Sequence, residues 1–296
     1  MTAPSAFEKV PAAIRAIIPA RFRGDIPIVP VVRLSGAIGI SSPLKPGLTL
    51  ANVARSLERA FAMHNARAVA LSINSPGGAA AQSHLIHRRI RALADEKKIP
   101  VIAFVEDVAA SGGYMIACAA DEIIADESSI VGSIGVVGGS FGFDKLIEKI
   151  GVEQRLYTSG ENKAMLDPFL PENPDHVARL KAIQEDIHAT FMGLVKTRRG
   201  AKLTAPEQEL FSGEYGAARK GMEYGLVDRI GDVRSTLRER YGDKVETPLV
   251  APKTSLFGRA TPGVGAGLDG LLDRPGLTDE LISSLEARAM WARYGL

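Results

Sequence analysis

The chain contains little cysteine and few aromatic residues. Its one cysteine, Cys118, excludes an internal disulfide and lies in the apolar run "MIACAA", where a small buried residue is expected. Aromatic residues make up only 6% of the sequence, and there are five histidines. His84 and His87 are three residues apart but have no evident third ligand nearby, so we expect neither a metal site nor a cofactor.

Long apolar runs are also absent. Nothing approaches the roughly 18 uninterrupted apolar residues that a membrane-spanning helix needs. Charged residues such as Glu8, Lys9 and Arg15 interrupt the apolar runs of the first segment, which argues against a signal peptide. We therefore expect a cytoplasmic protein. Residues 7–23 carry apolar residues near helical spacing together with basic ones, so two interpretations stay open: a peripheral contact with the inner membrane, and a short segment packed on protein.

Neither sign of charge dominates. The formal net charge is +2 at pH 7 over 296 residues, which is too small to indicate a nucleic-acid partner. With 46% hydrophobic and 24% charged residues, the composition is that of a globular protein with ample material for a core.

Strand-like and helix-like segments alternate in the first half of the chain. Apolar, β-branched segments at 26–39, 66–74 and 99–107 predict strands, and the apolar spacing of residues 49–64 and 79–96 predicts helices. This alternation predicts an α/β architecture built on a parallel sheet, with peripheral helices.

The second half is less regular. We expect a helix near 143–150, a strand over 152–159 and a long helix over 172–198, in which Asn173 is a candidate N-cap and Pro174 suits the first turn. A further helix is expected to start at Thr204.

Composition also divides the chain into parts. Residues 251–276 are rich in Gly and Pro and predict a linker, and the stretch after them predicts a docking helix. We therefore expect an N-terminal basic segment over 1–25, a main domain over 26–250 and a tail over 251–296.

Three turns follow the predicted strands. "INSPGG" follows the strand at 66–74, "ASGG" follows the strand at 99–107, and "TSGENK" ends the strand at 152–159. Ligands bind outside the carboxyl ends of the strands in open α/β sheets. We therefore expect the three turns to surround one site.

Ser111, in "VAASGGYMIA", lies at the predicted start of a helix. Backbone N–H groups are unpaired there and the helix dipole adds positive charge. The N–H of Gly112 could receive the oxyanion that forms when the Ser111 hydroxyl attacks a carbonyl, with a second donor from Gly77 or Gly78. The same tetrapeptide also suits a plain N-cap, so the residues alone leave nucleophile and cap open.

A serine nucleophile needs a base. None of the five histidines lies on one of the three turns, whereas Lys163 follows the "SG" of the third turn and precedes the apolar residues 164–166. Apolar surroundings favour the neutral amine that a catalytic lysine requires, and Ser–Lys pairs are a known variant of the catalytic triad. Lysines usually lie on the surface, so a solvated Lys163 stays open as well.

Taken together, four motifs carry a family resemblance. The chain resembles the signal peptide peptidase A family of serine peptidases, which includes SohB, over roughly residues 28–240. The matching stretches are "LSINSPGG" (71–78), "VAASGGYMIACAADEIIADESSIVGSIGV" (108–136), "TSGENKAMLDP" (158–168) and "GEYGAARKGMEYGLVDRIG" (213–231).

The resemblance implies more than the residues do by themselves. It implies a Clp-protease/crotonase-like fold, a spiral of ββα units. It also implies a catalytic dyad of Ser111 and Lys163, with an oxyanion hole from Gly112 and from Gly78 or Gly77. Family members form ring-like or dome-like homo-oligomers, and the dyad often draws on neighbouring subunits. Many members carry a transmembrane anchor that this sequence does not show.

We therefore expect a serine endopeptidase that cleaves extended apolar peptides, such as signal-peptide remnants, through an acyl-enzyme on Ser111 with Lys163 as general base. A Clp-like Ser-His-Asp peptidase would need a histidine downstream of the serine, and residues 119–160 contain none. A crotonase-type acyl-CoA hydratase or isomerase would use the same oxyanion hole without Lys163. A catalytically inactive scaffold of the same fold would need neither residue.

Overall fold

The computed structural model describes residues 26–40, 47–251 and 277–296, with side chains in the last range from residue 284 onward. The predicted N-terminal basic segment, with its membrane contact, and nearly all of the predicted linker lie outside the described residues. The domain limits drawn from composition stay a prediction.

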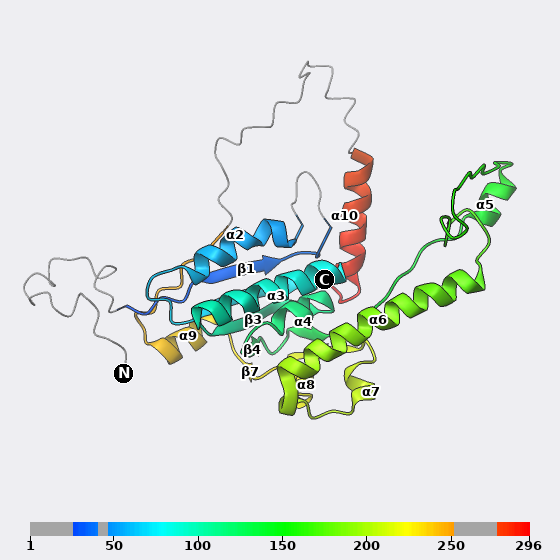
Figure 1. The fold of residues 1–296 in the computed structure, drawn as a ribbon. Coiled ribbons are helices and arrows are strands. Elements are labelled where there is room, and N and C mark those ends of the chain that lie inside the picture. The colour runs from blue at the N-terminus through cyan, green and yellow to red at the C-terminus, as the bar shows by residue number, and fades with distance from the viewer. Residues whose placement is uncertain (1–25, 41–46, 252–276) are drawn as a thin grey trace, which may run out of the picture.

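A mostly parallel sheet forms the centre of the molecule (Figure 1). Every residue of the second strand, "VALSINS", is buried, as expected of a strand that is covered on both faces. The predicted α/β class with a parallel sheet is therefore confirmed. Five strands run parallel to their neighbours, in the order β1 (Val31–Ser35), β2 (Val69–Ser75), β3 (Val101–Ala110), β4 (Glu122–Ala125) and β7 (Arg229–Ile230).

The strand β3 serves two different pairings along its length. Its first half pairs with β4, and its end pairs in parallel with β5 (Ile130–Gly132) in the register Val108↔Ile130. The antiparallel strand β6 (Tyr215–Ala217) continues from β5. The sheet thus branches at the carboxyl end of β3, directly before Ser111.

Helices cover both faces of the sheet. Alternate side chains of the strands point to opposite faces, and the buried apolar residues accordingly form two clusters, one on each side. One face carries α2 (Leu50–Phe61), α3 (Ala80–Lys97), α4 (Gly112–Ala117) and α6 (Pro174–Arg199), and the other carries α9 (Val233–Tyr241).

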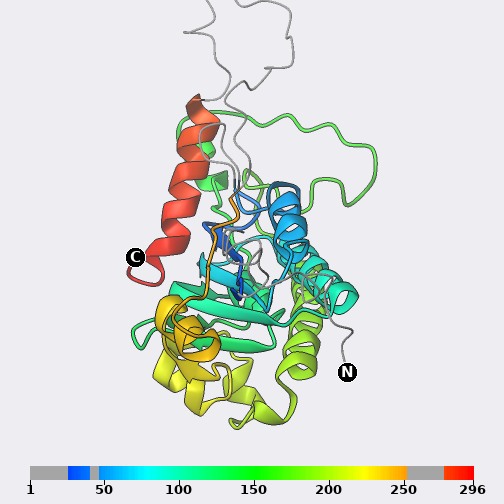
Figure 2. The same ribbon diagram turned by 90° about the vertical axis from the view of Figure 1, so that its left-hand side faces the viewer.

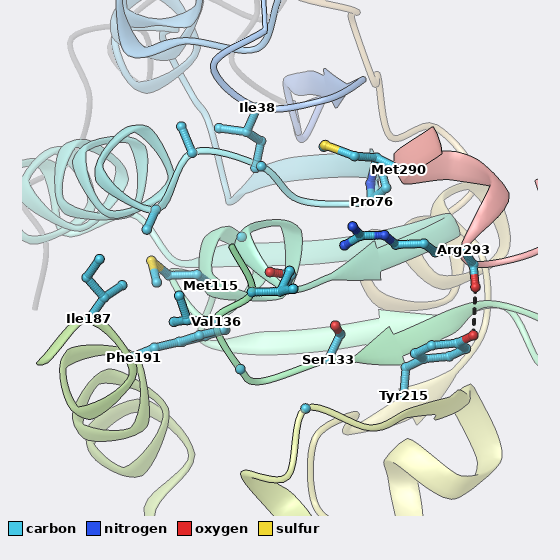
Figure 3. A pocket seen from close by; sticks show the side chains of 18 of the residues that line it. Ile38, Pro76, Met115, Ser133, Val136, Ile187, Phe191, Tyr215, Met290 and Arg293 are labelled. Carbon is cyan, nitrogen blue, oxygen red and sulfur yellow. Dashed lines mark hydrogen bonds between the residues drawn. The ribbon is translucent and has the colours of Figure 1, made fainter. Parts of the chain in front are cut away.

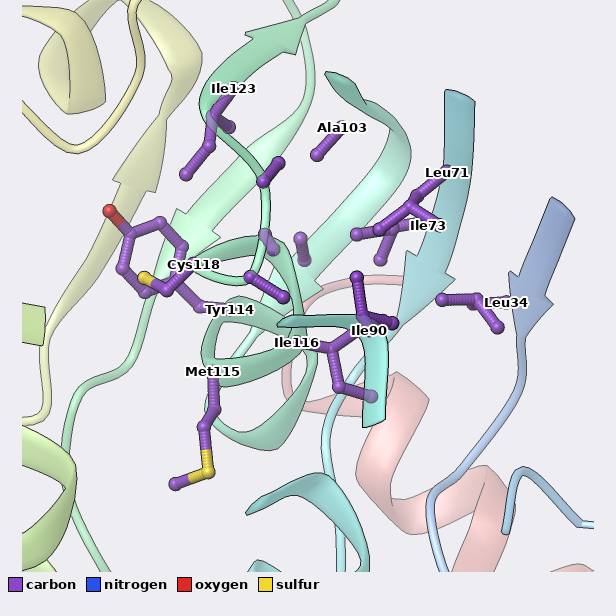
Figure 4. Close-up of a cluster of buried hydrophobic side chains, with 14 of the residues drawn as sticks. Leu34, Leu71, Ile73, Ile90, Ala103, Tyr114, Met115, Ile116, Cys118 and Ile123 are labelled. Atoms are coloured by element: carbon purple, nitrogen blue, oxygen red, sulfur yellow. The ribbon is translucent and has the colours of Figure 1, made fainter. Parts of the chain in front are cut away.

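The helix α4 anchors the turn at Ser111 in the core (Figure 4). Tyr114, Ile116 and Cys118 are fully buried, and the Tyr114 hydroxyl donates to the Leu226 carbonyl at 2.8 Å. Burial raises the pKa of the Cys118 thiol to about 12, so this residue is a small buried group, as its apolar surroundings in the sequence predict.

The long predicted helix is confirmed as α6, and so is its cap. The side chain of Asn173 accepts from the N–H of Asp175 at 2.8 Å, and Pro174 occupies the first turn. The helix predicted from Thr204 is only the single turn α7 (Glu207–Leu210), which starts after Pro206. Two further short elements complete this region, η3 (Gly200–Lys202) and α8 (Ala218–Glu223).

Residues 137–173, here called the α5 arm, stand away from the sheet at the N-terminal end of α6 (Figure 1). The arm contains the predicted helix as α5 (Asp144–Lys149). The strand predicted over 152–159 is wrong, because this segment pairs with no strand of the described residues. Val152 and Leu156 are exposed there, so the segment lacks both the pairing and the burial that stabilise a strand.

The final helix, α10 (Leu277–Ala292), confirms the predicted docking helix. Its end lies against the carboxyl ends of the strands, where the Tyr215 hydroxyl donates to the Arg293 carbonyl at 2.7 Å. Figures 1 and 2 show the helix rising from the sheet, apart from α2 and α3. Among the described stretches of the chain, no helix has the length and apolar character needed to cross a membrane.

Candidate active site

A cavity of about 1030 Å³ opens where β2, β3 and β5 end (Figure 3). Ser111, Gly112 and Gly78 line it together, so two of the three predicted turns meet at one place. The cavity is lined largely by apolar side chains, including those of Ile38, Met115, Val136, Ile187, Phe191 and Met290.

Ser111 occupies a strained turn between β3 and α4. Its φ of 52° and ψ of −122° lie in a region that residues other than glycine rarely adopt. The Ser111 N–H donates to the Gly132 carbonyl at 2.9 Å, which ties the turn to the end of β5. The side chain makes no capping hydrogen bond to α4. The plain N-cap interpretation of Ser111 is therefore wrong: the hydroxyl is left available at the cavity wall.

The turn after β2 contains two glycines, Gly77 and Gly78, and the N–H of either could in principle bind an oxyanion. The N–H of Gly77 donates to the Ser75 hydroxyl at 3.2 Å, which occupies it within the turn. The peptide groups on either side of Gly78 bond to Ile38 in a parallel pairing, so the N–H of Gly78 itself points away from that partner. Of the two glycines, Gly78 is thus the better oxyanion donor.

Gly77 has a different role: it allows the turn after β2 to pack directly against Ser111 and Gly112. A Cβ at this position would lie 2.8 Å from the Ser111 Cβ and 3.0 Å from the Gly112 nitrogen. Only a glycine lets the turn touch the backbone at Ser111, and the φ of 100° favours glycine independently. The turn therefore holds the Gly78 and Gly112 N–H groups next to Ser111.

Lys163 is not brought to this site within the chain. It lies exposed in the α5 arm, where its N–H donates to the Gly160 carbonyl at 3.2 Å, and it does not line the cavity. The third predicted turn therefore does not join the other two in one subunit, because the arm that carries it leaves the sheet.

Ser133 lines the cavity but was not singled out from the sequence. Its φ is 55°, and its N–H donates to the Glu214 carbonyl at 2.7 Å. The available signal was a serine next to a glycine at the end of a short β segment, in "VGSIGV". Such a signal is weak without knowledge of how β5 pairs.

His188 of α6 also lines the cavity. Its Nε2 lies 3.1 Å from the Ile134 carbonyl, a contact that fits the structural role expected for the histidines of this helix. Because it lines the same cavity as Ser111, it is nevertheless a base to be tested against Lys163. Among the described residues, no group of three or more His, Cys, Asp or Glu side chains could hold a metal ion.

The end of α10 supplies the remaining wall through Met290, Arg293 and Tyr294 (Figure 3). No acidic side chain is present among the described residues that line the cavity, and Arg293 is the only one that carries a full charge at neutral pH. The sequence predicted a docking helix here but not its position at the site.

An available serine hydroxyl in a strained strand-to-helix turn, beside backbone N–H groups and an apolar cavity, is the arrangement of a serine hydrolase. The family model for peptidase family S49 matches residues 93–244, about half of the chain. The chain therefore belongs to peptidase family S49, which confirms the resemblance found in its motifs. The model for the N-terminal domain of NfeD1b matches residues 37–145.

Several curated proteins are similar to this chain. The Na(+)/H(+) antiporter NhaA of Brucella abortus is 54% identical over 293 residues, which are 97% of this chain and 39% of that protein. The chloroplastic serine protease SPPA of Arabidopsis thaliana is 29% identical over 271 residues, 85% of this chain and 39% of that protein. The chain thus spans about two-fifths of the length of these relatives.

One solved structure, of a membrane-bound stomatin-specific protease, overlaps 77% of this chain and 99% of that chain, with a TM-score of 0.46 and 18% identity.

Proposed function

We propose that this chain is a serine endopeptidase that cleaves extended apolar peptides through an acyl-enzyme on Ser111, with Lys163 of a second copy as the general base. The observation that carries the proposal is the Ser111 hydroxyl, which is left out of helix capping and lies beside Gly78 and Gly112 at the wall of an apolar cavity.

The shape of the cavity favours an extended peptide. Residues 38–40 border it on one side, and residues 135–137, beyond β5, border it on the other. Ile38 already pairs with Gly78 and with Leu48, whereas residues 136 and 137 lie in none of the described strands. The backbone of this second stretch can therefore pair with a peptide bound as a strand, which is a general mode of peptide recognition. The apolar side chains between them favour apolar substrate residues.

The chemistry follows from these positions. The neutral amine of Lys163 takes the proton of the Ser111 hydroxyl as Oγ attacks the scissile carbonyl. The N–H groups of Gly112 and Gly78 bind the oxyanion that forms. The lysine then passes the proton to the leaving amine, and a water molecule hydrolyses the ester on Ser111 by the reverse sequence.

A second copy supplies the base in this proposal because Lys163 lies on an arm that leaves its own cavity. The α5 arm also exposes large apolar side chains, with Phe141 80%, Tyr157 89% and Ile150 64% exposed. Apolar patches of this kind mark interaction surfaces in soluble proteins. Docking of the arm on a neighbouring copy would bury this surface and carry Lys163 toward the neighbour's Ser111. In a closed homo-oligomer, ring-like or dome-like, every arm docks on a neighbouring copy in the same way.

A fluorophosphonate probe tests the nucleophile and the base. The probe should label the wild type and fail to label Ser111→Ala or Lys163→Ala, whereas Lys149→Ala, which removes another lysine from the α5 arm, should be labelled normally. If labelling survives in Lys163→Ala but is lost in His188→Ala, the general base is His188 of the cavity wall and not Lys163.

Mixed assemblies test whether the dyad forms between copies. Ser111→Ala and Lys163→Ala chains with different tags are co-expressed and purified together. If Lys163 acts across an interface, the Lys163→Ala chain regains labelling because its partner supplies the lysine. A mixture as unreactive as its parents would show that each dyad lies within one chain.

Family membership favours the peptidase over the crotonase-type alternative. Turnover of an enoyl-CoA without cleavage of any peptide would reverse that preference, and absence of both activities would point to the inactive scaffold.

A further inference from the structure

The turn that follows α10 is fixed against the cavity by the Arg293 carbonyl and by Tyr294. The Tyr215 hydroxyl of β6 donates to the Arg293 carbonyl at 2.7 Å, and the Tyr215 and Tyr294 rings meet edge-on with their centres 4.8 Å apart. The Tyr294 hydroxyl lies 3.4 Å from the Pro76 carbonyl and 3.3 Å from the Ser133 Oγ. These contacts tie the end of α10 to the turn that carries the oxyanion glycines.

The docking leaves the Arg293 side chain directed into the cavity. Figure 3 shows it reaching between Pro76 and Ser133 from the end of α10. No hydrogen bond or ion pair joins its guanidinium to another of the described residues, and no carboxylate among them lines the cavity. A cation that lines the same cavity as Ser111 and has no counter-charge there can bind an anion supplied by the ligand.

The geometry points to Arg293 as a specificity-determining residue that binds a carboxylate of the peptide substrate. This inference rests on the proposed peptidase function and extends it by a substrate class. A guanidinium presents paired N–H donors that match the two oxygens of a carboxylate. Arg293 is exposed, so its guanidinium stays hydrated and the attraction has the modest strength of a pair at the protein surface.

The carboxylate has two possible sources with the same chemistry. It is either the side chain of an Asp or Glu or the C-terminal carboxylate of the peptide. The first predicts cleavage beside an acidic residue of an otherwise apolar peptide, and the second predicts cleavage near a free carboxyl end.

A binding experiment on Ser111→Ala separates this inference from the proposed catalysis. Fluorescent apolar peptides are compared in matched pairs, one pair with Glu against Gln and one with a free carboxyl end against its amide. The favoured carboxylate member should bind about twofold to fivefold more tightly, which is the strength of an ion pair made by an exposed side chain. The pair that shows the difference identifies the source. Higher salt should reduce the difference, since Arg293 is exposed to solvent.

Substitution of the arginine provides the decisive comparison. In the Ser111→Ala background, Arg293→Gln should abolish the preference and Arg293→Glu should transfer it to a Lys-containing peptide. The control Arg234→Gln removes the same charge from the exposed surface of α9, on the other face of the sheet, and should leave the preference unchanged. Equal binding of both members of each pair, or a preference that persists in Arg293→Gln, would overturn the assignment. Failure of Ser111 labelling in the otherwise unaltered chain would instead count against the proposed peptidase.

Discussion

Ser111 shows how a few neighbouring residues decide the use of a side chain. In an unstrained N-cap the serine hydroxyl would accept a hydrogen bond from an N–H of α4. The φ of 52° at Ser111 directs the hydroxyl elsewhere, and it makes no such bond. The strain is maintained because the Ser111 N–H bonds to Gly132 and because Gly77 packs directly on the turn. The structure separates the glycines that the sequence proposed together: Gly77 packs closely on Ser111, whereas Gly78 and Gly112 are the proposed oxyanion donors.

Gly77→Ala should strongly reduce the rate at which the fluorophosphonate probe labels Ser111, by about tenfold or more. The added Cβ would overlap the Ser111 Cβ and displace the oxyanion donors, and loss of one such donor typically costs about 10²-fold or more in rate. Thermal unfolding of the same variant measures the accompanying strain.

The matched control is Gly193→Ala, at a helical position of α6 where an added Cβ meets nothing within 4 Å. It should stabilise the fold by roughly 0.5–1 kcal/mol because alanine loses less backbone freedom than glycine in a helix. Normal labelling in Gly77→Ala would contradict the close-approach argument.

His87 gives a prediction for stability against pH. Burial first, and then the charge of Arg198, lower the pKa of this imidazole from 6.5 to about 4. Between these two pH values the unfolded chain binds the proton and the folded chain does not. The stabilisation is therefore complete above pH 6.5 and decreases by about 3 kcal/mol as the pH falls to 4.

Urea unfolding of the wild type and His87→Leu across pH 4 to 7 tests this sign. The variant should lose less stability on acidification than the wild type over that range. Parallel curves for the two proteins would show that His87 is not the group that titrates.

At the scale of the elements, the sequence correctly predicted helices and strands whose own residues carry a cap or a clear apolar pattern. The cap at Asn173, the apolar spacing of α2 and the buried run of β2 are all short-range features, and all three elements form. The prediction of a strand over 152–159 failed because a strand needs a partner, and none of the described strands pairs with this segment. The helix expected from Thr204 was reduced to one turn after Pro206.

The Arg199–Asp228 ion pair connects the end of α6 to the entry of β7. The two side chains pair at 2.8 and 3.0 Å, and the Lys202 ammonium lies 2.7 Å from the same carboxylate. Burial opposes ionisation of Asp228, but hydrogen bonds from Arg199 and Lys202 outweigh it and hold the pKa of the carboxyl below 3.8. Asp228→Ala should destabilise the fold by about 3 kcal/mol, because it leaves the buried Arg199 without its counter-charge.

Because the pKa of Asp228 is lowered in the folded state, its stabilisation is complete well above pH 3.8. The stabilisation is lost as the pH falls through the lower, folded-state value. Asp228→Ala should therefore remove part of the acid-induced loss of stability below pH 4, and Met222→Ala on α8 serves as a control at a half-exposed apolar site. An unchanged acid limb of the unfolding curve would contradict this assignment.

At the scale of the whole molecule, the chain is incomplete as a catalyst in the proposed scheme. The cavity holds the nucleophile, the backbone donors and a cation, whereas the proposed base lies on the exposed α5 arm. The same arm exposes a large apolar surface. Assembly would meet both requirements at once, since it buries the surface and supplies the lysine.

Tyr157→Asp should therefore shift the protein to smaller species in sedimentation velocity and reduce Ser111 labelling in parallel. A charge placed on a side chain that is 89% exposed should not unfold the chain, but it would oppose burial in an interface. Met222→Asp, which places the same charge on α8, is the control. If the Tyr157→Asp protein keeps the size of the wild type, the α5 arm is not part of the interface between copies.

The sequence by itself determined the parallel α/β class, the turns at Ser111 and Gly78, the capped helix α6 and the family. These depend on residues within a few positions of one another, where backbone preference and apolar spacing act directly. Only the tertiary structure decided that two of the three predicted turns meet, that Lys163 remains apart, and that Ser133, His188 and Arg293 face the cavity. Such contacts join elements far apart in the chain, and their geometry depends on how the sheet branches at the end of β3 and where α10 docks, which no local pattern encodes.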